Sequence, residues 1–137
     1  MSYDNNNPFA KILRGELPCI NLYEDQQILV MMDIMPQADG HVLVIPKEQA
    51  ITLPDLSDQS AAACMQAAKR FIKATAAAVG KESATLFQLN GVEAGQTVPH
   101  VHFHIIPGSI LNAKMHAREV AEMQHLQAIA EKIKAQL

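Results

Sequence analysis

Residues 99–107 read PHVHFHIIP and place three histidines, His100, His102 and His104, at every second position, with apolar residues between and after them. Successive side chains of a β-strand point to opposite faces. The alternation therefore predicts a strand with a row of imidazoles on one face and an apolar row on the other. The apolar row needs a covering layer, so we expect a sheet with a helix packed against one face.

Further apolar runs bounded by turn residues predict the rest of that sheet. Strands are expected within CINLYED (19–25), ILVMMDI (28–34), HVLVIP (41–46) and ATLFQLN (84–90). A long helix is expected from a cap at Ser57 to Gly80, and a short one after a cap at Asn7 with Pro8 in its first turn. The tail from Asn112 is expected to form a polar, partly exposed helix. Many strands with short connections and few helices favour an α+β fold with a mainly antiparallel sheet.

The whole-chain properties narrow the class of protein. A length of 137 residues suggests one domain, and a net charge of −3 argues against a protein that coats nucleic acid. The first residues do not resemble a secretion signal, and no apolar run reaches the ~20 residues that span a bilayer. Cys19 and Cys64 are isolated, which is typical of reduced thiols. We therefore expect a cytoplasmic protein that binds neither membrane nor nucleic acid.

The histidine row allows three interpretations: a metal site, polar packing or catalysis. On a straight strand the first and last histidines would be ~13 Å apart, too far to share one zinc ion with bonds of ~2.0–2.1 Å. Packing alone would leave three imidazoles that each need two partners. A neutral imidazole is a nucleophile, and its neighbours can orient it and bind developing charge. The preceding loop, with Gly95, Gln96 and Thr97, offers donors to a phosphate.

The motif HVHFHII resembles the signature of the histidine triad (HIT) family of nucleotide hydrolases and transferases, His-φ-His-φ-His-φ-φ with φ apolar. The segments PFAKILRGELP, YEDQQILVMMDIMPQADGHVLVIPK and LNGVEAGQTVPHVHFHIIP resemble HIT segments in the same order. The resemblance implies a five-stranded antiparallel sheet with one short and one long helix and a homodimer. We expect a flexible N-terminus at 1–6, the HIT domain at 7–110 and a C-terminal tail or helix at 111–137.

The resemblance also implies catalytic roles. His102 would attack the α-phosphorus and form a covalent nucleotidyl-histidine, which water then hydrolyses. His100 would orient His102, and His104 would donate to a phosphate oxygen. Thr97 would help to protonate the leaving group. Because the nucleotide-transferring branch has Gln at the third histidine, the presence of His104 favours hydrolysis.

Substrate-binding positions follow from the same resemblance. Asn90, Gln96 and Gly95 would lie at the phosphates or leaving group, with His41 as a supporting residue. Asp33 would accept hydrogen bonds from the ribose hydroxyls. The base would lie between apolar side chains, namely Phe9, Ile12, Met31 and Ile34. His116 and His125, in the tail, are expected on the helix surface.

The chain departs from the family pattern at several positions. Relatives that bind structural zinc carry cysteines and a histidine where this chain has Asn7, Ala10 and Gln49, so we expect no metal and no cofactor. Gly108 and Ser109 follow the triad where many relatives have Arg, which weakens the expectation of polyphosphate substrates.

The main functional hypothesis is hydrolysis of purine nucleoside monophosphate derivatives of the phosphoramidate type, releasing AMP or GMP, because the early segments resemble the Hint branch. The loop EAGQTV resembles the fragile-histidine-triad branch equally well, so hydrolysis of dinucleoside polyphosphates is the alternative. A rival of another class is a nucleotide-binding or scaffold protein whose role does not need turnover.

Overall fold

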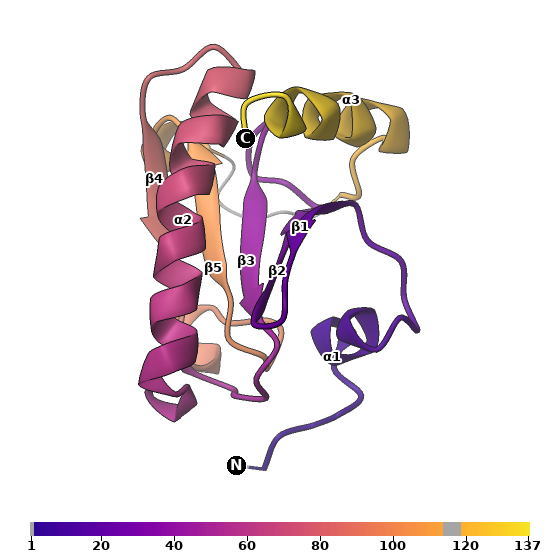
Figure 1. Ribbon diagram of the computed structural model, residues 1–137, viewed down its shortest axis with the longest axis vertical. Helices are drawn as coiled ribbons and strands as arrows, with labels where there is room; N and C mark the ends of the chain where they lie inside the picture. The colour runs from indigo at the N-terminus through magenta and orange to yellow at the C-terminus, as the bar shows by residue number, and fades with distance from the viewer. Residues whose placement is uncertain (1, 114–118) are drawn as a thin grey trace.

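The computed structural model describes residues 2–113 and 119–137 and contains one five-stranded, wholly antiparallel sheet with the strand order β1-β2-β3-β5-β4 (Figure 1). The strands are β1 (Asn21–Glu24), β2 (Ile28–Met32), β3 (Val42–Pro46), β4 (Ala84–Phe87) and β5 (Phe103–Pro107). All five lie within the segments predicted from the sequence, and the α+β expectation is confirmed.

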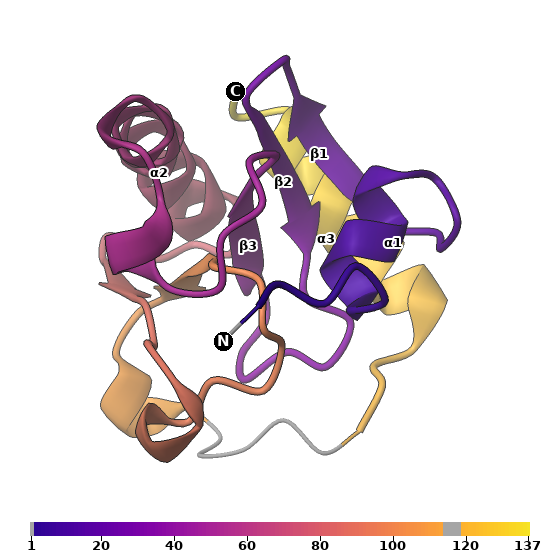
Figure 2. The ribbon, with the colours of Figure 1, turned by 90° about the horizontal axis from the view of Figure 1, so that it is seen from below.

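The helices cover the two faces of the sheet unequally. The long helix α2 (Asp58–Ala78) and the helix α3 (Met123–Lys134) pack on one face, and the short α1 (Pro8–Leu13) lies on the other (Figures 1 and 2). Three 3-10 turns lie in the connections: η1 (Leu53–Asp55), η2 (Val92–Ala94) and η3 (Ile110–Asn112). Both faces of β2 and β3 are therefore buried, which explains their continuous apolar sequences.

Alternate residues of β2 serve the two cores. Ile28, Val30 and Met32 pack in the main core under α2 and α3, around the fully buried Phe71. Leu29 and Met31 face the smaller core under α1. The period of two in side-chain direction thus places neighbouring residues of one apolar run in two different cores.

The helix ends follow the expected capping chemistry. Asn7 Oδ1 accepts from the N–H of Ala10 at 2.9 Å, and Pro8 occupies the first helical position. Ser57 Oγ accepts from the N–H of Ser60 at 3.1 Å, and Gly80 adopts a positive φ of 72° beyond the last turn of α2. The predicted starts of both helices and the predicted end of the long helix are confirmed.

The fifth strand is shorter than the sequence predicts. It begins at Phe103, so only His104 of the three histidines lies on a regular strand. Pro99 has no N–H for a ladder, and the N–H of His100 turns back to the carbonyl of Val98 at 2.9 Å. Pairing with β3 starts only at Val44 and Phe103. His100 and His102 therefore lie in an irregular segment leading into β5.

The C-terminal helix differs from the predicted polar tail. It begins at Met123 rather than near Asn112, and it buries Leu126, Ile129, Ala130 and Ile133 in the main core. This spacing places the four side chains on one face of the helix. The expectation for His116 falls on residues 114–118, outside the described residues. His125 is exposed, as expected, and pairs with Asp39 at 2.9 Å.

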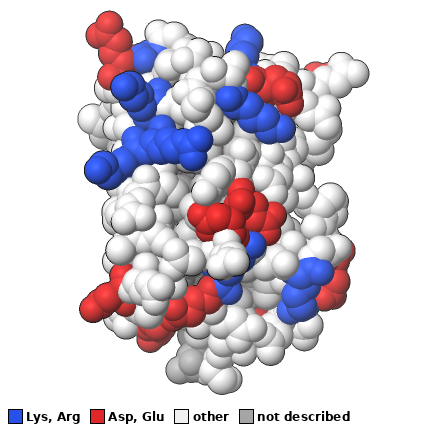
Figure 3. All heavy atoms as spheres, viewed as in Figure 1, with Lys and Arg blue, Asp and Glu red and all other residues white. Residues whose placement is uncertain are grey.

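The surface carries both signs of charge. On the face that bears α2, Lys and Arg side chains are interspersed with Asp and Glu (Figure 3). Of the helices formed by residues 2–113 and 119–137, none has the length and apolarity needed to cross a bilayer.

The buried face of α3 leads to a stability prediction. Ile133 is fully buried against the main core, so Ile133→Ala is expected to lower the free energy of unfolding by about 2–4 kcal/mol. Urea denaturation of this variant and of Leu137→Ala, a partly exposed residue of the same tail, measures the difference. Equal stability of the two variants would show that α3 does not belong to the folded core.

Candidate active site

The three histidines and His41 gather on the face of the sheet that carries α1. His104 lies opposite Leu43 on β3 and Phe87 on β4, and its ring stacks on that of Phe87 with centroids 4.4 Å apart. The rings of His102 and His104 are 4.8 Å apart. Phe9 of α1 contacts His102 edge-to-face at 4.8 Å. The interruption of β5 therefore does not separate His102 and His104.

A hydrogen bond determines which nitrogen of His102 is nucleophilic. Nδ1 lies 2.7 Å from the carbonyl oxygen of His100, so Nδ1 carries the proton and donates. In a neutral imidazole the lone pair is then on Nε2. No group of residues 2–113 or 119–137 donates to this nitrogen. His102 thus presents an unprotonated nitrogen while its other nitrogen is held by the backbone.

His100 is fully buried and is bonded at both ring nitrogens. Its Nε2 lies 2.8 Å from the carbonyl oxygen of Pro46, so Nε2–H is the donor. Its Nδ1 accepts from the hydroxyl of Tyr3. These two hydrogen bonds fix the ring of His100, the residue whose carbonyl accepts from Nδ1–H of His102.

His41 and His104 form a second ordered pair. The backbone N–H of Gln37 donates to Nδ1 of His41 at 3.0 Å, so the proton of a neutral His41 lies on Nε2. This Nε2–H donates to Nδ1 of His104 at 2.9 Å and lies 3.4 Å from Oδ2 of Asp33. A neutral His104 then carries its proton on Nε2, where it can donate to a phosphate oxygen.

Burial keeps these imidazoles neutral. It acts together with repulsion from a protonated His102 to lower the pKa of His41 to about 4. Burial, with the charges of His102 and His41, also lowers the pKa of His104 far below its usual value. The pKa of His102 falls for the same main reason, although its bond to the His100 carbonyl opposes the shift. At neutral pH the site therefore combines a neutral nucleophile with a neutral donor.

The same contacts bear on whether the site could bind a metal ion. Within the described ranges, Asp33, His41 and His104 are the group of three possible ligands, with atoms within 4.8 Å of one another. His41 already uses its lone pair to accept from Gln37, so its Nε2 is protonated and cannot bind a metal unless that bond breaks. The contacts favour a proton-donating pair. The absence of zinc and of any cofactor stays a prediction from the sequence.

The loop before the triad is closed by Gln96. Its amide donates to the carbonyls of Ile51 at 2.7 Å and Val98 at 2.9 Å, and its Oε1 accepts from the N–H of Gly91. Both amide hydrogens are thus engaged by the backbone, so a direct contact to phosphate would require one of these bonds to break. In this structure Gln96 shapes the loop, and its predicted phosphate contact is not supported by these bonds.

The other loop residues are more accessible. Gly95 adopts a left-handed conformation with φ of 100°, and Thr97 is exposed, so the backbone and hydroxyl can meet a ligand. Asn90 is bonded to Gln88 and to the N–H of Leu53 at 2.8 Å, which ties this loop to η1. The ligand contacts expected of these residues stay predictions.

The predicted nucleoside residues lie together only in part. Phe9, Met31 and Ile12 belong to the small core under α1, beside His102. Ile34 is 43% exposed, beyond the end of β2. Asp33 accepts from the N–H of Met35 at 2.8 Å and lies near His41. Burial raises the pKa of Asp33 to about 6.

Two residues at the site were missed from the sequence. Phe87 lies within the segment predicted as the fourth strand and is the last residue of β4, but only the register of β4 against β5 shows that its ring stacks on His104. Tyr3 precedes the first helix in a segment expected to be flexible, and it reaches His100 across the fold. No periodic signal marks either residue. The zinc-ligand positions are occupied otherwise: Asn7 caps α1, Ala10 is buried and Gln49 donates to Asn5.

Comparison with known proteins agrees with this arrangement. An adenosine 5'-monophosphoramidase of Schizosaccharomyces pombe is 46% identical over 99 residues, covering 72% of this chain and 71% of the relative. An adenylylsulfatase of Arabidopsis thaliana is 41% identical over 103 residues, and the match covers 75% of this chain but only 52% of that protein. The crystal structure of a Hit-like protein from Bartonella henselae superposes with a TM-score of 0.92 at 39% identity, covering all of both chains.

The sequence motif, the fold and these relatives converge on one family. The HIT domain model matches residues 14–110, which include all five strands and the three histidines. The chain therefore belongs to the histidine triad family, as a HIT-domain protein.

Proposed function

We propose that this protein is a nucleotide hydrolase that cleaves purine nucleoside phosphoramidates and releases AMP or GMP. The observation that carries the proposal is the bond from Nδ1–H of His102 to the carbonyl of His100, which leaves Nε2 as an unprotonated nucleophile. Relatives named as an adenosine 5'-monophosphoramidase and an adenylylsulfatase support this class of reaction.

The reaction has two displacements at phosphorus. Nε2 of His102 attacks the α-phosphorus, a P–N bond to His102 forms, and the bond to the leaving amine breaks with its electron pair on the amine. Thr97 helps to deliver the proton that the amine needs. Water then attacks the phosphorus and gives up a proton, which replaces the proton delivered to the amine. The P–Nε2 bond breaks with its electron pair on Nε2, and the nucleoside monophosphate leaves. The His100 carbonyl stabilises the positive charge on the imidazole ring in between.

The pair of His41 and His104 serves the developing charge on phosphate. With His104 protonated on Nε2, its N–H points away from His41 and is available to a non-bridging oxygen. Asp33 is the acceptor for the ribose hydroxyls, because a carboxylate can accept from both hydroxyls of a vicinal diol. A homodimer and a cytoplasmic location stay predictions.

The nucleophile leads to the first activity prediction. His102→Ala is expected to lower kcat for an adenosine phosphoramidate by at least about 10⁴-fold, because the covalent path is removed. Rapid quenching of the wild-type protein should show an AMP adduct on His102 by peptide mass spectrometry. His125→Ala, an exposed histidine paired with Asp39, is the matched control and should retain turnover. Turnover in His102→Ala similar to the wild type would refute the assignment, and full complementation of a gene deletion by an inactive variant would favour the scaffold alternative.

The raised pKa of Asp33 predicts a pH dependence of nucleoside binding. A carboxyl with a pKa of about 6 is ionised above that pH and protonated below it. Affinity for adenosine, which has no phosphate to titrate, is therefore expected to fall as the pH decreases through about 6, as isothermal calorimetry can measure. Asp33→Asn should lose the pH dependence and bind more weakly at a pH of about 7.5, where a carboxyl with this pKa is almost fully ionised. Unchanged affinity in this variant would remove Asp33 from the ribose site.

Substrate preference distinguishes the proposal from the polyphosphate alternative. With no Arg after the triad at Gly108 or Ser109, we expect kcat/KM for an adenosine phosphoramidate to exceed that for diadenosine tri- or tetraphosphate by at least about tenfold. Parallel initial-rate assays with one enzyme preparation measure the ratio. A preference for either polyphosphate would assign the protein to the alternative activity.

A further inference from the structure

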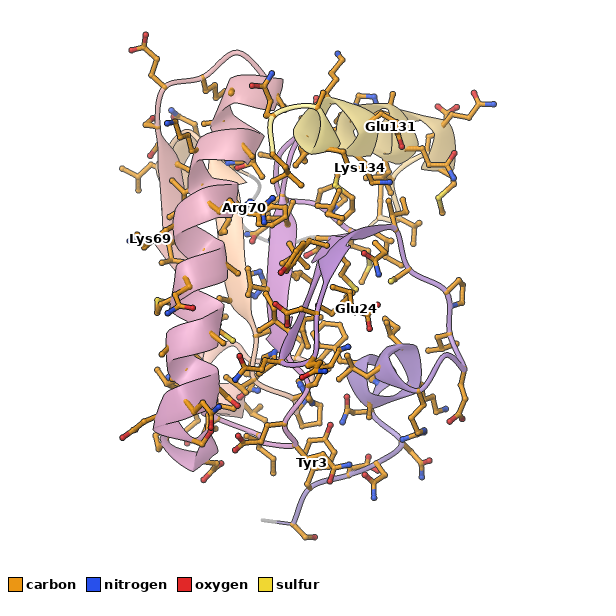
Figure 4. All side chains as sticks on the ribbon, in the orientation of Figure 1. Tyr3, Glu24, Lys69, Arg70, Glu131 and Lys134 are labelled. Carbon is orange, nitrogen blue, oxygen red and sulfur yellow. The ribbon has the colours of Figure 1, made fainter. Side chains whose placement is uncertain are left out.

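Tyr3 contacts the triad from a part of the chain that precedes every helix and strand. Its hydroxyl bonds to Nδ1 of His100, and its ring packs edge-to-face on the imidazole with centroids 5.6 Å apart. In Figure 4 the Tyr3 side chain lies on the N-terminal segment below α1 and points into the molecule. The contact joins residues 97 positions apart in the sequence.

The segment that carries Tyr3 is held by bonds at its other residues. Asn7 Nδ2 donates to the carbonyl of Asp4 at 2.7 Å, and Arg14 Nη1 donates to the carbonyl of Asn5 at 2.7 Å. Gln49, after β3, donates to Asn5 Oδ1 at 2.9 Å. These bonds link the segment both to α1 and to the chain that leaves the sheet next to Pro46.

The hydroxyl of Tyr3 supplies the hydrogen-bond donor that Nδ1 of a neutral His100 needs in this position. Nε2–H donates to the carbonyl of Pro46, which leaves a lone pair on Nδ1 that must accept a proton donor. Because His100 is fully buried, an unpaired Nδ1 would carry a desolvation cost that favours a different ring orientation. Burial raises the pKa of Tyr3, so its hydroxyl keeps the proton that it donates.

We propose that Tyr3 is a positioning residue of the site: by holding the ring of His100, it fixes the carbonyl that binds Nδ1–H of His102 and so keeps the lone pair of His102 on Nε2. Tyr3 does not touch the reacting atoms and acts through two successive hydrogen bonds. The catalytic part of this inference rests on the proposed function, whereas the effect on the imidazoles does not.

The test compares Tyr3→Phe with Tyr23→Phe, since the chain has only two tyrosines. Each variant removes one hydroxyl and retains the ring. The hydroxyl of Tyr23 donates to Asp25 at 2.9 Å near the start of β2, away from the triad. Long-range ¹⁵N–¹H correlation spectra of the histidine rings report which nitrogen is protonated, and initial rates with an adenosine phosphoramidate report kcat and KM.

In Tyr3→Phe the Nδ1 resonance of His100 is expected to move downfield as its donor is lost, and His102 is expected to populate both neutral tautomers. We expect kcat to fall about tenfold with KM nearly unchanged. A tenfold change corresponds to about 1.4 kcal/mol, which is within the range for the loss of one hydrogen bond. Tyr23→Phe should leave the spectra and the rates unchanged.

The outcomes separate this inference from the proposed function. Unchanged imidazole spectra in Tyr3→Phe would overturn the positioning role, whatever the activity. Altered His100 and His102 spectra with an unchanged kcat would also overturn it. If the wild-type protein releases no AMP, the proposed function fails, and the tautomer of His102 in the two variants alone decides whether Tyr3 positions it.

Discussion

The hydrogen bond between Nδ1–H of His102 and the carbonyl of His100 is the interaction on which the candidate site depends. It decides which nitrogen of the central imidazole can attack. The bond is possible because the chain before β5 is irregular: Pro99 cannot donate, and the ladder with β3 begins only at Phe103. The carbonyl of His100 is therefore not engaged by the sheet and can accept from the side chain two residues later.

The cost of burying four imidazoles is offset by hydrogen bonds at their ring nitrogens, with Nε2 of His102 and Nε2 of His104 as the exceptions among the described contacts. An unpaired buried polar group costs on the order of 1–3 kcal/mol, and no buried side-chain N or O among the described residues lacks a partner. Gln37 donates to His41, which in turn donates to His104, and Tyr3 donates to His100. These bonds determine which ring nitrogen of each histidine carries the proton. Burial lowers the pKa of each of these four histidines, so the same environment that requires pairing also keeps the rings neutral.

The outer elements support this arrangement from both faces. The short helix α1 is too short to be stable alone, and its Phe9 packs on Leu29 and Met31 of β2 as well as on His102. On the other face, α3 supplies Leu126 and Ile133 to the core that backs the sheet. The sequence of α3 is mostly polar, but its apolar residues lie on one face and pack in the main core. The helix therefore helps to hold in place the strands that carry the site.

The sequence by itself determined the strands, the capped helices and the identity of the histidines, because period-two alternation, Asn7, Ser57 and the HVHFHII motif are local signals. It did not determine where β5 begins. The predicted strand extends from Pro99 to Pro107, whereas the backbone hydrogen bonds to β3 begin only at Phe103. It also could not show that Tyr3 reaches His100, that Phe87 stacks on His104 or that the amide of Gln96 is used by the backbone. These contacts join residues far apart in the chain or depend on strand register and ring tautomers, so only the tertiary structure decided them.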